Sequence, residues 1–270
     1  MNSKASVHDF WNEASCGERL LLPSIDRAGF EQQARERYRL EPYIESFADF
    51  QRWRGCAMLE IGVGLGADHQ RFAEAGAVSH GIDLTPRAIE MCQLRLQTFG
   101  LRSDLRVADA EQLPFPDGSF DLVWSWGVIH HSPDTPAAIR EIHRVLKPGG
   151  TARVMIYNTW SLVGLMLWVR YGLLRGRPWT TMREIYSRYL ESPGTKAYTS
   201  GQARSLFSAF SQVHIETVLT HGDLLASGAG QRHAGALLTM ARRLWPRRVI
   251  SRLFPKAGLF MLIDARKPAP

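Results

Sequence analysis

The chain has 270 residues, of which 45% are hydrophobic, enough for one sizeable core with insertions or an added cap. Its three cysteines (Cys16, Cys56, Cys92) form no C-x-x-C pair, which argues against a disulfide framework or zinc site and favours a reducing cytoplasm. The net charge is +7, and residues 1–10 lack an apolar core, so we expect no secretory signal.

Residues 1–55 are expected to be helical and to precede a sheet. The run from Met58 to Gly66 then reads MLEIGVGLG, an apolar strand followed by glycines at alternate positions. Gly62, Gly64 and Gly66 let the backbone turn sharply and approach a ligand. A helix beginning near Ala67 presents free N–H groups to that ligand. The pattern predicts a nucleotide-like cofactor, and it also fits the dinucleotide fingerprint, whose last position tolerates alanine.

Further strands follow in alternation with helices. Residues 78–83 predict a second strand that ends in Asp83, whose carboxylate could accept hydrogen bonds from ribose hydroxyls. A third strand, 105–107, precedes Asp109, and a proline-rich loop leads into a fourth strand that ends near Trp124. A helix ends in the RVLKPGG run at residues 144–150, and a fifth strand is expected from Thr151 to Tyr157. This alternation predicts a parallel sheet with right-handed crossovers.

The second half of the chain interrupts this alternation twice. The apolar stretch from Trp160 to Val169 is too short to span a bilayer, which needs ~20 residues. It could lie on a membrane surface or cover a substrate. Residues 241–256 hold six basic residues and no acid, which suits anionic lipid, nucleic acid or an acidic substrate, or a solvated helix face. Two final strands are expected at 212–219 and 258–264.

Five sequence blocks, in this order, resemble class I S-adenosylmethionine-dependent methyltransferases: LEIGVGLG, GIDLT, DAEQLPFPDGSFDLVW, GVIHHSPD and RVLKPGG. The branch is the small-molecule group that includes the ubiquinone and menaquinone methyltransferases. The third acid followed by L-P-F-P-D, and the later K-P-G-G turn, are not expected in a nicotinamide dehydrogenase. The resemblance covers about residues 56–157.

The resemblance implies an α/β, Rossmann-like fold. Its seven-stranded sheet is mostly parallel with an antiparallel last strand, has helices on both faces, and carries helical cap insertions. The implied parts of the chain are an N-terminal helical cover (1–55), an S-adenosylmethionine-binding core (56–157), a lid insertion (158–200), and a C-terminal part of the core (201–270) with a basic insertion (224–256).

The resemblance also implies S-adenosylmethionine as the cofactor, S-adenosylhomocysteine as its product, and no metal. The glycines from Gly62 to Gly66 would wrap the methionine moiety, and Glu60 would lie near its ammonium group. Tyr38, which precedes the core, would touch the methionine carboxylate. Capping of the glycine turn is the alternative role for Glu60.

The adenosine half of the cofactor would meet the next two strand ends. By the same resemblance, Asp83 holds the ribose diol and Leu84 packs on the adenine. Asp109 accepts a hydrogen bond from the adenine amino group, and the Ala110 backbone donates to the ring. Capping of the following helices is the alternative for the two aspartates.

The loop after the fourth strand should border the sulfonium and the methyl acceptor. Trp126 could face the cofactor, because an aromatic ring favours a positive sulfonium, or it could pack in the core. An amine or alcohol acceptor needs a base within hydrogen-bond reach, whereas an ionised nucleophile needs none. The candidate bases are His131, Tyr157, His221 and Asp223, each of which could instead be structural. Of the paired His130 and His131, His131 is expected to lie nearer the cofactor.

The predicted function is methyl transfer to an O, N or C atom of a small, partly apolar or aromatic molecule. The aromatic and apolar insertion after residue 158 suggests a hydrophobic lid, and the basic segments allow contact with a membrane surface. An RNA methyltransferase is one alternative, although Trp124–Gly127 reads WSWG rather than an N-P-P-Y-type tetrapeptide. A non-catalytic scaffold is the other alternative. The sequence does not specify an oligomeric state.

Overall fold

The computed structural model describes residues 4–226 and 242–269. Much of the predicted basic insertion, residues 227–241, lies outside the described residues. One seven-stranded sheet has the order β3-β2-β1-β4-β5-β7-β6. The strands are β1 (Ala57–Ile61), β2 (Val78–Asp83), β3 (Asp104–Val107), β4 (Phe120–Trp126), β5 (Leu146–Tyr157), β6 (Gln212–Val218) and β7 (Phe260–Arg266).

The strand directions confirm the predicted fold class. Strand β1 pairs in parallel with β2 and β4, and β2–β3 and β4–β5 are also parallel. Strand β7 is antiparallel to both β5 and β6, as expected of the last strand. The chain order reverses beside β1, so the crevice beyond the carboxyl ends of β1 and β4 is the switch point where open α/β sheets bind ligands.

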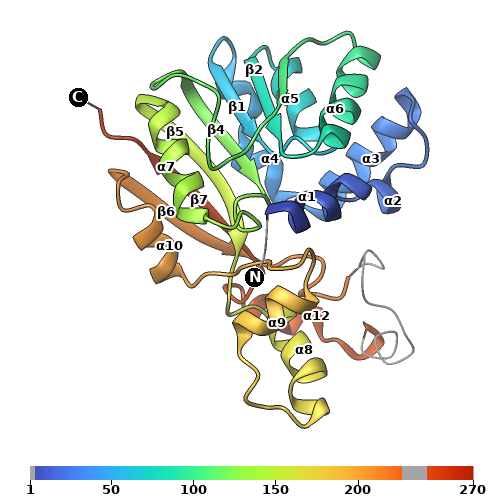
Figure 1. Ribbon diagram of the computed structural model, residues 1–270. Coiled ribbons are helices and arrows are strands. Elements are labelled where there is room, and N and C mark those ends of the chain that lie inside the picture. Colours follow the sequence, from blue (N-terminus) through green and yellow to red (C-terminus); the bar gives the residue numbers. More distant parts are fainter. Residues whose placement is uncertain (1–3, 227–241, 270) are drawn as a thin grey trace.

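Helices cover both faces of this sheet (Figure 1). Their bounds are α1 (Lys4–Glu13), α2 (Glu18–Leu21), α3 (Arg27–Leu40), α4 (Tyr43–Ala48), η1 (Phe50–Trp53), α5 (Ala67–Glu74), α6 (Pro86–Thr98), α7 (Thr135–Val145), α8 (Leu162–Tyr171), η2 (Leu173–Arg175), α9 (Met182–Tyr189), α10 (Ser200–Leu206) and α12 (Arg247–Leu253). None of the helices in the described ranges is long and apolar enough to cross a membrane.

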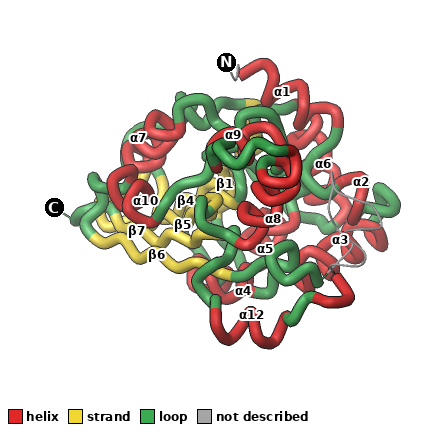
Figure 2. Tube along the Cα trace, turned by 90° about the horizontal axis from the view of Figure 1, so that it is seen from below, coloured by secondary structure: helices red, strands yellow, loops and turns green. Residues whose placement is uncertain are grey.

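Two apolar layers hold these helices on the sheet. Ile139 and Ile142 of α7 and Phe207 beyond α10 pack against one face of the sheet. On the other face, Ile44 and Phe72 from α4 and α5 pack on the remaining strand residues. Helices α8 and α9 form a projection beyond the sheet (Figure 1), and the view from below places them in front of β1 and β5 (Figure 2).

Element boundaries differ slightly from expectation. Strand β5 begins at Leu146 rather than Thr151, because Leu146 already pairs with Phe120 of β4. Helix α10 begins at Ser200, where Thr199 and Gln202 form a capping box.

Candidate functional site

A cavity of about 220 Å³ lies at the carboxyl ends of β1, β2 and β4. Its wall combines the glycine turn after β1, the ends of the neighbouring strands, helix α1, and Glu191 from the segment after α9. The predicted site residues that line it are Glu60, Gly62, Gly64, Gly66, Asp83, Leu84, Asp109, Ala110, Trp126, His131 and Tyr157.

Two predicted site residues, Tyr38 and His221, are not part of this wall. The hydroxyl of Tyr38 donates a hydrogen bond to Asp68, a residue of the cavity wall, at 3.0 Å. His221 follows β6, which is the outermost strand of the sheet, so the end of that strand does not open onto the switch point. Asp223 lies in the same turn after β6. Its carboxylate accepts hydrogen bonds from the backbone N–H groups of Thr220 and Leu259, so it stabilises this turn.

The structure explains why glycine occupies each of the three positions in the turn after β1. All three glycines have positive φ, +84° at Gly62, +50° at Gly64 and +74° at Gly66. A Cβ at Gly62 would lie 2.1 Å from a methyl group of Val128, and one at Gly66 would lie 2.7 Å from the sulfur of Cys92. A Cβ at Gly64 would meet no heavy atom of the described chain within 4 Å. The first and third glycines therefore allow close packing, and the middle one leaves room on the cavity side.

Asp83 is held rigidly beside this turn. Its Oδ2 accepts from the Gly64 N–H at 3.2 Å, and its Oδ1 accepts from the backbone and hydroxyl of Thr85 at 3.0 Å each. Burial raises the pKa of Asp83, and these hydrogen bonds partly oppose that shift. The carboxylate is thus oriented by the backbone at the end of β2, where it can accept further hydrogen bonds from a ligand.

Glu60 is buried and belongs to a polar chain beneath the turn. The Ser103 hydroxyl donates to the Ser79 carbonyl at 2.7 Å, so it can only accept from His69 Nε2 at 2.8 Å. The other nitrogen, His69 Nδ1, lies 2.9 Å from Glu60 Oε2. Burial lowers the pKa of His69 to about 4 and raises the pKa of Glu60 well above its usual value. Both shifts favour the neutral form of the pair, in which a protonated Glu60 would donate a hydrogen bond to His69 Nδ1.

Asp68 and Arg37 were not predicted from the sequence, although both line the cavity. Arg37 donates from Nε and Nη2 to the two carboxylate oxygens of Asp68 at 3.1 and 2.6 Å. Arg37 also lies 3.5 Å from Glu41, which accepts from the indole N–H of Trp126 at 3.1 Å. The only sequence signal for Asp68 is its place in the first turn of α5, directly after the glycines.

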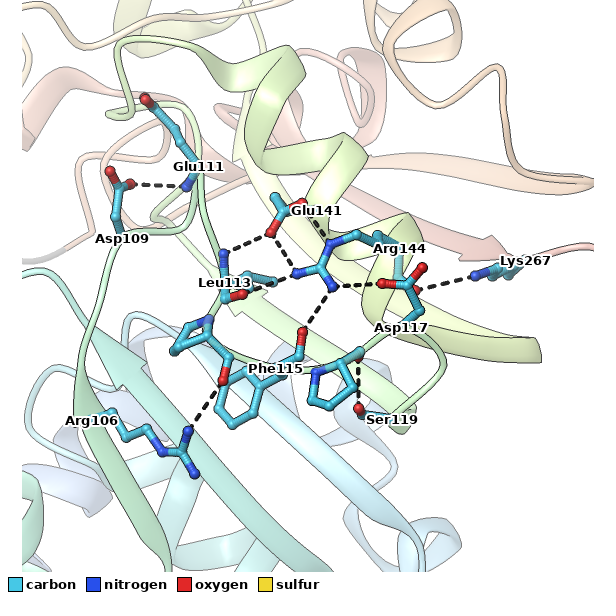
Figure 3. A network of polar contacts seen from close by, with 12 residues as sticks. Arg106, Asp109, Glu111, Leu113, Phe115, Asp117, Ser119, Glu141, Arg144 and Lys267 are labelled. Carbon is cyan, nitrogen blue, oxygen red and sulfur yellow. Dashed lines mark hydrogen bonds and ion pairs between the residues drawn. The ribbon is translucent and has the colours of Figure 1, made fainter.

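The loop after β3 is fixed by Arg144 from the end of α7 (Figure 3). Its guanidinium donates to the carbonyls of Leu113 and Phe115 and forms an ion pair with Glu141 at 2.7 Å. Glu141 in turn accepts from the Leu113 N–H at 2.7 Å. The arginine of the RVLKPGG block therefore shapes the proline-rich loop that joins β3 to β4.

Asp109 stands at the start of this loop. Its Oδ1 accepts from the Glu111 N–H at 2.9 Å, and its Oδ2 is bonded to the ammonium group of Lys4 from α1. Lys4 also lies 2.7 Å from Glu111, whose carboxylate accepts from the Asp134 N–H at 2.8 Å. Neither carboxylate caps a following α-helix, because the residues after β3 form turns.

The far wall of the cavity holds a second polar cluster. The Tyr157 hydroxyl donates to Glu191 Oε2 at 2.6 Å, and the same oxygen lies 3.5 Å from His131 Nε2. The other nitrogen of His131 lies 2.8 Å from the Ser192 hydroxyl and 3.2 Å from the Thr195 hydroxyl. Burial and Glu191 raise the pKa of Tyr157 well above its usual value, so its hydroxyl stays protonated. The lid segment thus supplies the acid of this cluster, which sequence reasoning missed.

His130 has a different environment from its neighbour. Its side chain is fully buried, and neither ring nitrogen has a hydrogen-bond partner among the described residues. Its ligand atom lies within 4.8 Å of those of His131 and Glu191, so these three side chains could hold a metal ion.

Aromatic and apolar groups surround this cluster. Trp11 of α1 lies edge-on to His131 with ring centroids 5.5 Å apart. Trp126 is nearly buried, stacks on Trp124 at 5.3 Å and also lines the cavity, so it packs in the core and is part of the cavity wall. Cys16 and Phe260 line the wall as well.

Comparison with known proteins agrees with this architecture. Residues 59–154 match the family described as methyltransferase domain. The chain is 39% identical over 99 residues to 27-O-demethylrifamycin SV methyltransferase of Amycolatopsis mediterranei, covering 36% of this chain and 36% of that one. It is 38% identical over 117 residues to phosphoethanolamine N-methyltransferase 2 of Caenorhabditis elegans, covering 43% of this chain and 26% of that one. The chain therefore spans well under half the length of these relatives.

Solved structures show the same fold. Phosphoethanolamine N-methyltransferase 2 of Haemonchus contortus, crystallised with S-adenosylhomocysteine, superposes with a TM-score of 0.61 at 20% identity over 97% of this chain and 60% of that one. The [4+2]-cyclase SpnF superposes with a TM-score of 0.55 at 18% identity over 89% of this chain and 82% of that one.

The sheet order, the glycine turn and the strand-end acids define a class I methyltransferase fold with a nucleoside-type site at its switch point. Residues 59–154 match the methyltransferase-domain family, and the relatives and the fold support a class I S-adenosylmethionine-dependent methyltransferase. The cofactor of this family is S-adenosylmethionine, and the wall fits it: a turn left open at Gly64, a carboxylate held by backbone at Asp83, and an aromatic ring at Trp126.

Proposed function

We propose that the protein transfers the methyl group of S-adenosylmethionine to a small, partly apolar or aromatic molecule. The carrying observation is that one cavity joins the glycine turn and two strand-end aspartates to an aromatic wall with its own acid and imidazole. The [4+2]-cyclase that shares this fold shows why the fold alone does not fix the reaction.

The residues at the glycine end would bind the cofactor. Asp83 would accept from the ribose hydroxyls, with Leu84 on the adenine, and Asp109 and the Ala110 backbone would meet the adenine edge. Glu60 and the glycine turn would hold the methionine moiety. The guanidinium of Arg37, which lines the cavity beside Asp68, suits the methionine carboxylate better than Tyr38, which does not line it.

The residues at the aromatic end would receive the acceptor. S-adenosylmethionine, when bound, would supply an electrophilic methyl group to an acceptor that this end of the cavity holds in line with the carbon–sulfur bond. Trp11, Trp126 and Phe260 form apolar walls that exclude water from this space.

A hydroxyl or amine acceptor must lose a proton during this step, and the Glu191 cluster offers two places for it. Glu191 is held by Tyr157 at 2.6 Å, and His131 presents Nε2 on the same side. The hydroxyls of Ser192 and Thr195 fix the other side of the His131 ring. His131 and Tyr157 therefore remain the proposed catalytic residues, Glu191 joins them, and His221 is set aside because it does not line the cavity.

Macromolecular acceptors are less well suited to this site. Both described cations in the wall are already paired, Lys4 with Asp109 and Glu111, and Arg37 with Asp68 and Glu41. A nucleic-acid backbone would need exposed cations around the opening. Contact with a membrane surface stays a prediction of the sequence, and its best structural basis lies in the lid.

The first test is calorimetric titration with S-adenosylmethionine and S-adenosylhomocysteine, with NADH as the control. We expect the first two to bind in the micromolar range and NADH not to bind. Apolar phenols, amines and carboxylic acids would then be screened as acceptors by the formation of S-adenosylhomocysteine. Binding of NADH in place of the other two would overturn the proposal, and binding without turnover on any acceptor would favour the non-catalytic scaffold.

A further inference from the structure

The lid ends in an exposed apolar surface that methyl transfer does not explain. We call residues 170–183, with η2 at their centre, the lid tip. Leu173, Leu174 and Trp179 lie on it, and the side chains of Leu174 and Trp179 are 67% and 75% exposed. Isolated exposed leucines are common on protein surfaces, but an exposed tryptophan beside two leucines at the end of a projection is not.

The lid tip is also strongly basic. Arg170, Arg175, Arg177 and Arg183 are exposed, and no acidic residue occurs from Ser161 to Arg183. The guanidinium groups of Arg170 and Arg175 lie 5.2 and 5.0 Å from the centre of the Tyr171 ring. That ring stacks on Tyr189 of α9 at 4.0 Å. Two of the positive charges are thus held around one aromatic pair beside the exposed leucines.

Hydrogen bonds hold the lid tip in a defined conformation. The Gly172 N–H donates to the Trp168 carbonyl at 2.8 Å, and the Arg177 N–H donates to the Gly172 carbonyl at 2.9 Å. The indole N–H of Trp168 donates to the Thr180 carbonyl at 3.1 Å, and a capping box at Thr181 starts α9. Because this turn is internally bonded, Leu174 and Trp179 are presented outward rather than folded back onto the lid.

We propose that the lid tip docks on an anionic lipid bilayer. Trp179 and Leu174 would enter the interfacial region, where tryptophan is favoured, and the surrounding arginines would pair with lipid phosphates. Charge complementarity selects this occupant, since a surface with four cations, no acid and a hydrophobic centre matches a negatively charged, partly apolar surface. A nucleic acid would match the charge but leave the leucines exposed to water.

Docking of the lid tip on a bilayer would affect how the acceptor reaches the cavity. This consequence rests on the proposed methyl transfer. Helix α9 leads directly from the lid tip to Glu191 in the cavity wall. Figure 1 places α12, with its exposed Leu253 and Phe254, at the same end of the molecule. A docked lid would therefore bring the acceptor end of the cavity near the interface, where amphiphilic acceptors partition.

The test is binding of the full chain to phosphatidylcholine vesicles prepared with and without phosphatidylglycerol, measured by flotation. We expect binding to the anionic vesicles that weakens with added salt. Arg175→Gln with Arg177→Gln should weaken it roughly 25-fold, because each basic residue near an anionic surface contributes ~1 kcal/mol, or about fivefold. Trp179→Ser should also weaken vesicle binding. Trp179→Phe should keep vesicle binding but remove the shift in tryptophan fluorescence emission that we expect when Trp179 enters the bilayer interface.

Matched controls change exposed arginines and an exposed apolar residue elsewhere on the surface. Arg35→Gln with Arg140→Gln removes two exposed arginines, with side chains 68% and 70% exposed, from α3 and α7. Ile25→Ser removes a residue that is 54% exposed. Both controls should bind vesicles like the wild type.

The result that overturns the proposal is absence of binding to anionic vesicles, or equal loss in the control variants. Self-association of the wild type that Trp179→Ser abolishes, without lipid binding, would identify a second copy of the chain as the occupant instead. Cofactor titration of every variant keeps the two proposals apart, because vesicle binding does not require a working methyl-transfer site.

Discussion

Gly64 offers the sharpest test of where the cofactor lies. It is the middle glycine of the turn, has φ of +50° and lines the cavity. Its added Cβ would meet no heavy atom of residues 4–226 and 242–269 within 4 Å, in contrast to Gly62 and Gly66, where a Cβ would collide with Val128 or Cys92. Substitution of Gly64 by alanine therefore adds a methyl group to the proposed binding space rather than to the core.

Two separate effects of Gly64→Ala can be estimated. An alanine in the left-handed region costs ~1–2 kcal/mol of folding stability. For a domain of this size, that lowers the midpoint of thermal unfolding by about 2–4 °C per kcal/mol. An extra methyl group in a filled site costs ~1–3 kcal/mol of binding free energy. This raises the dissociation constant of S-adenosylmethionine roughly 5- to 150-fold.

Gly100→Ala is the matched control. Gly100 has φ of +70°, its Cβ would also meet no heavy atom of the described part of the chain within 4 Å, and it lies after α6, away from the cavity wall. Thermal unfolding and calorimetric titration would be measured for both variants and the wild type. We expect similar losses of stability in the two variants and weaker cofactor binding in Gly64→Ala alone.

The refuting result is equally specific. If Gly64→Ala loses the expected stability but binds S-adenosylmethionine as tightly as Gly100→Ala, the cofactor does not run along the glycine turn. The cavity assignment would then be wrong, whatever the chain's activity.

Other changes test the remaining parts of the site. Asp83→Asn, which preserves the size of the side chain, should weaken the affinity for S-adenosylmethionine at least about tenfold in titration, because it removes an anionic acceptor of ribose hydrogen bonds. Unchanged affinity would mean that the ribose does not bind at Asp83. Glu191→Gln and Tyr157→Phe should leave cofactor affinity within about twofold but lower turnover of a hydroxyl or amine acceptor roughly 100-fold or more in steady-state assays; a parallel loss of affinity would mean a structural role. Burial lowers the pKa of His130 well below its usual value, so the unfolded chain binds a proton that the folded chain does not, and the free energy of unfolding should fall as pH drops below about 6.5. Urea unfolding at several pH values should show a shallower fall for His130→Leu, and an identical slope would contradict this account. A chelator should leave cofactor binding and turnover unchanged, whereas their loss, restored by a divalent metal, would assign His130, His131 and Glu191 to a metal.

The sheet and the glycine end of the site could be predicted because their signals are local. A strand, a tight turn and a helix start are encoded within a few residues of Gly62, and parallel strands bring Glu60, Asp83 and Asp109 to one edge. The structure adds what each acid touches. Glu60 meets His69, and Asp109 meets Lys4.

The missed residues depend on contacts across long stretches of chain. Arg37 meets Asp68 across 31 residues, and Tyr157 meets Glu191 across 34, with no periodicity that marks either pair. His221 is a candidate that does not line the cavity, for the opposite reason. Its position after a strand is a local signal, but β6 lies at the edge of the sheet, and strand order is not readable from a single strand.

The contact between Lys4 and Asp109 connects the cover of the cavity to its proposed adenine end. Asp109 uses Oδ1 for the Glu111 N–H and Oδ2 for Lys4 of helix α1. An adenine amino group at this carboxylate would use the second lone pair of Oδ1, share Oδ2 with Lys4, or displace Lys4. Displacement would leave Lys4 bonded to Glu111 alone and loosen α1, which also carries Trp11 beside His131. In that third case, the proposed adenine binding and the position of the aromatic wall around the acceptor would be coupled through one carboxylate.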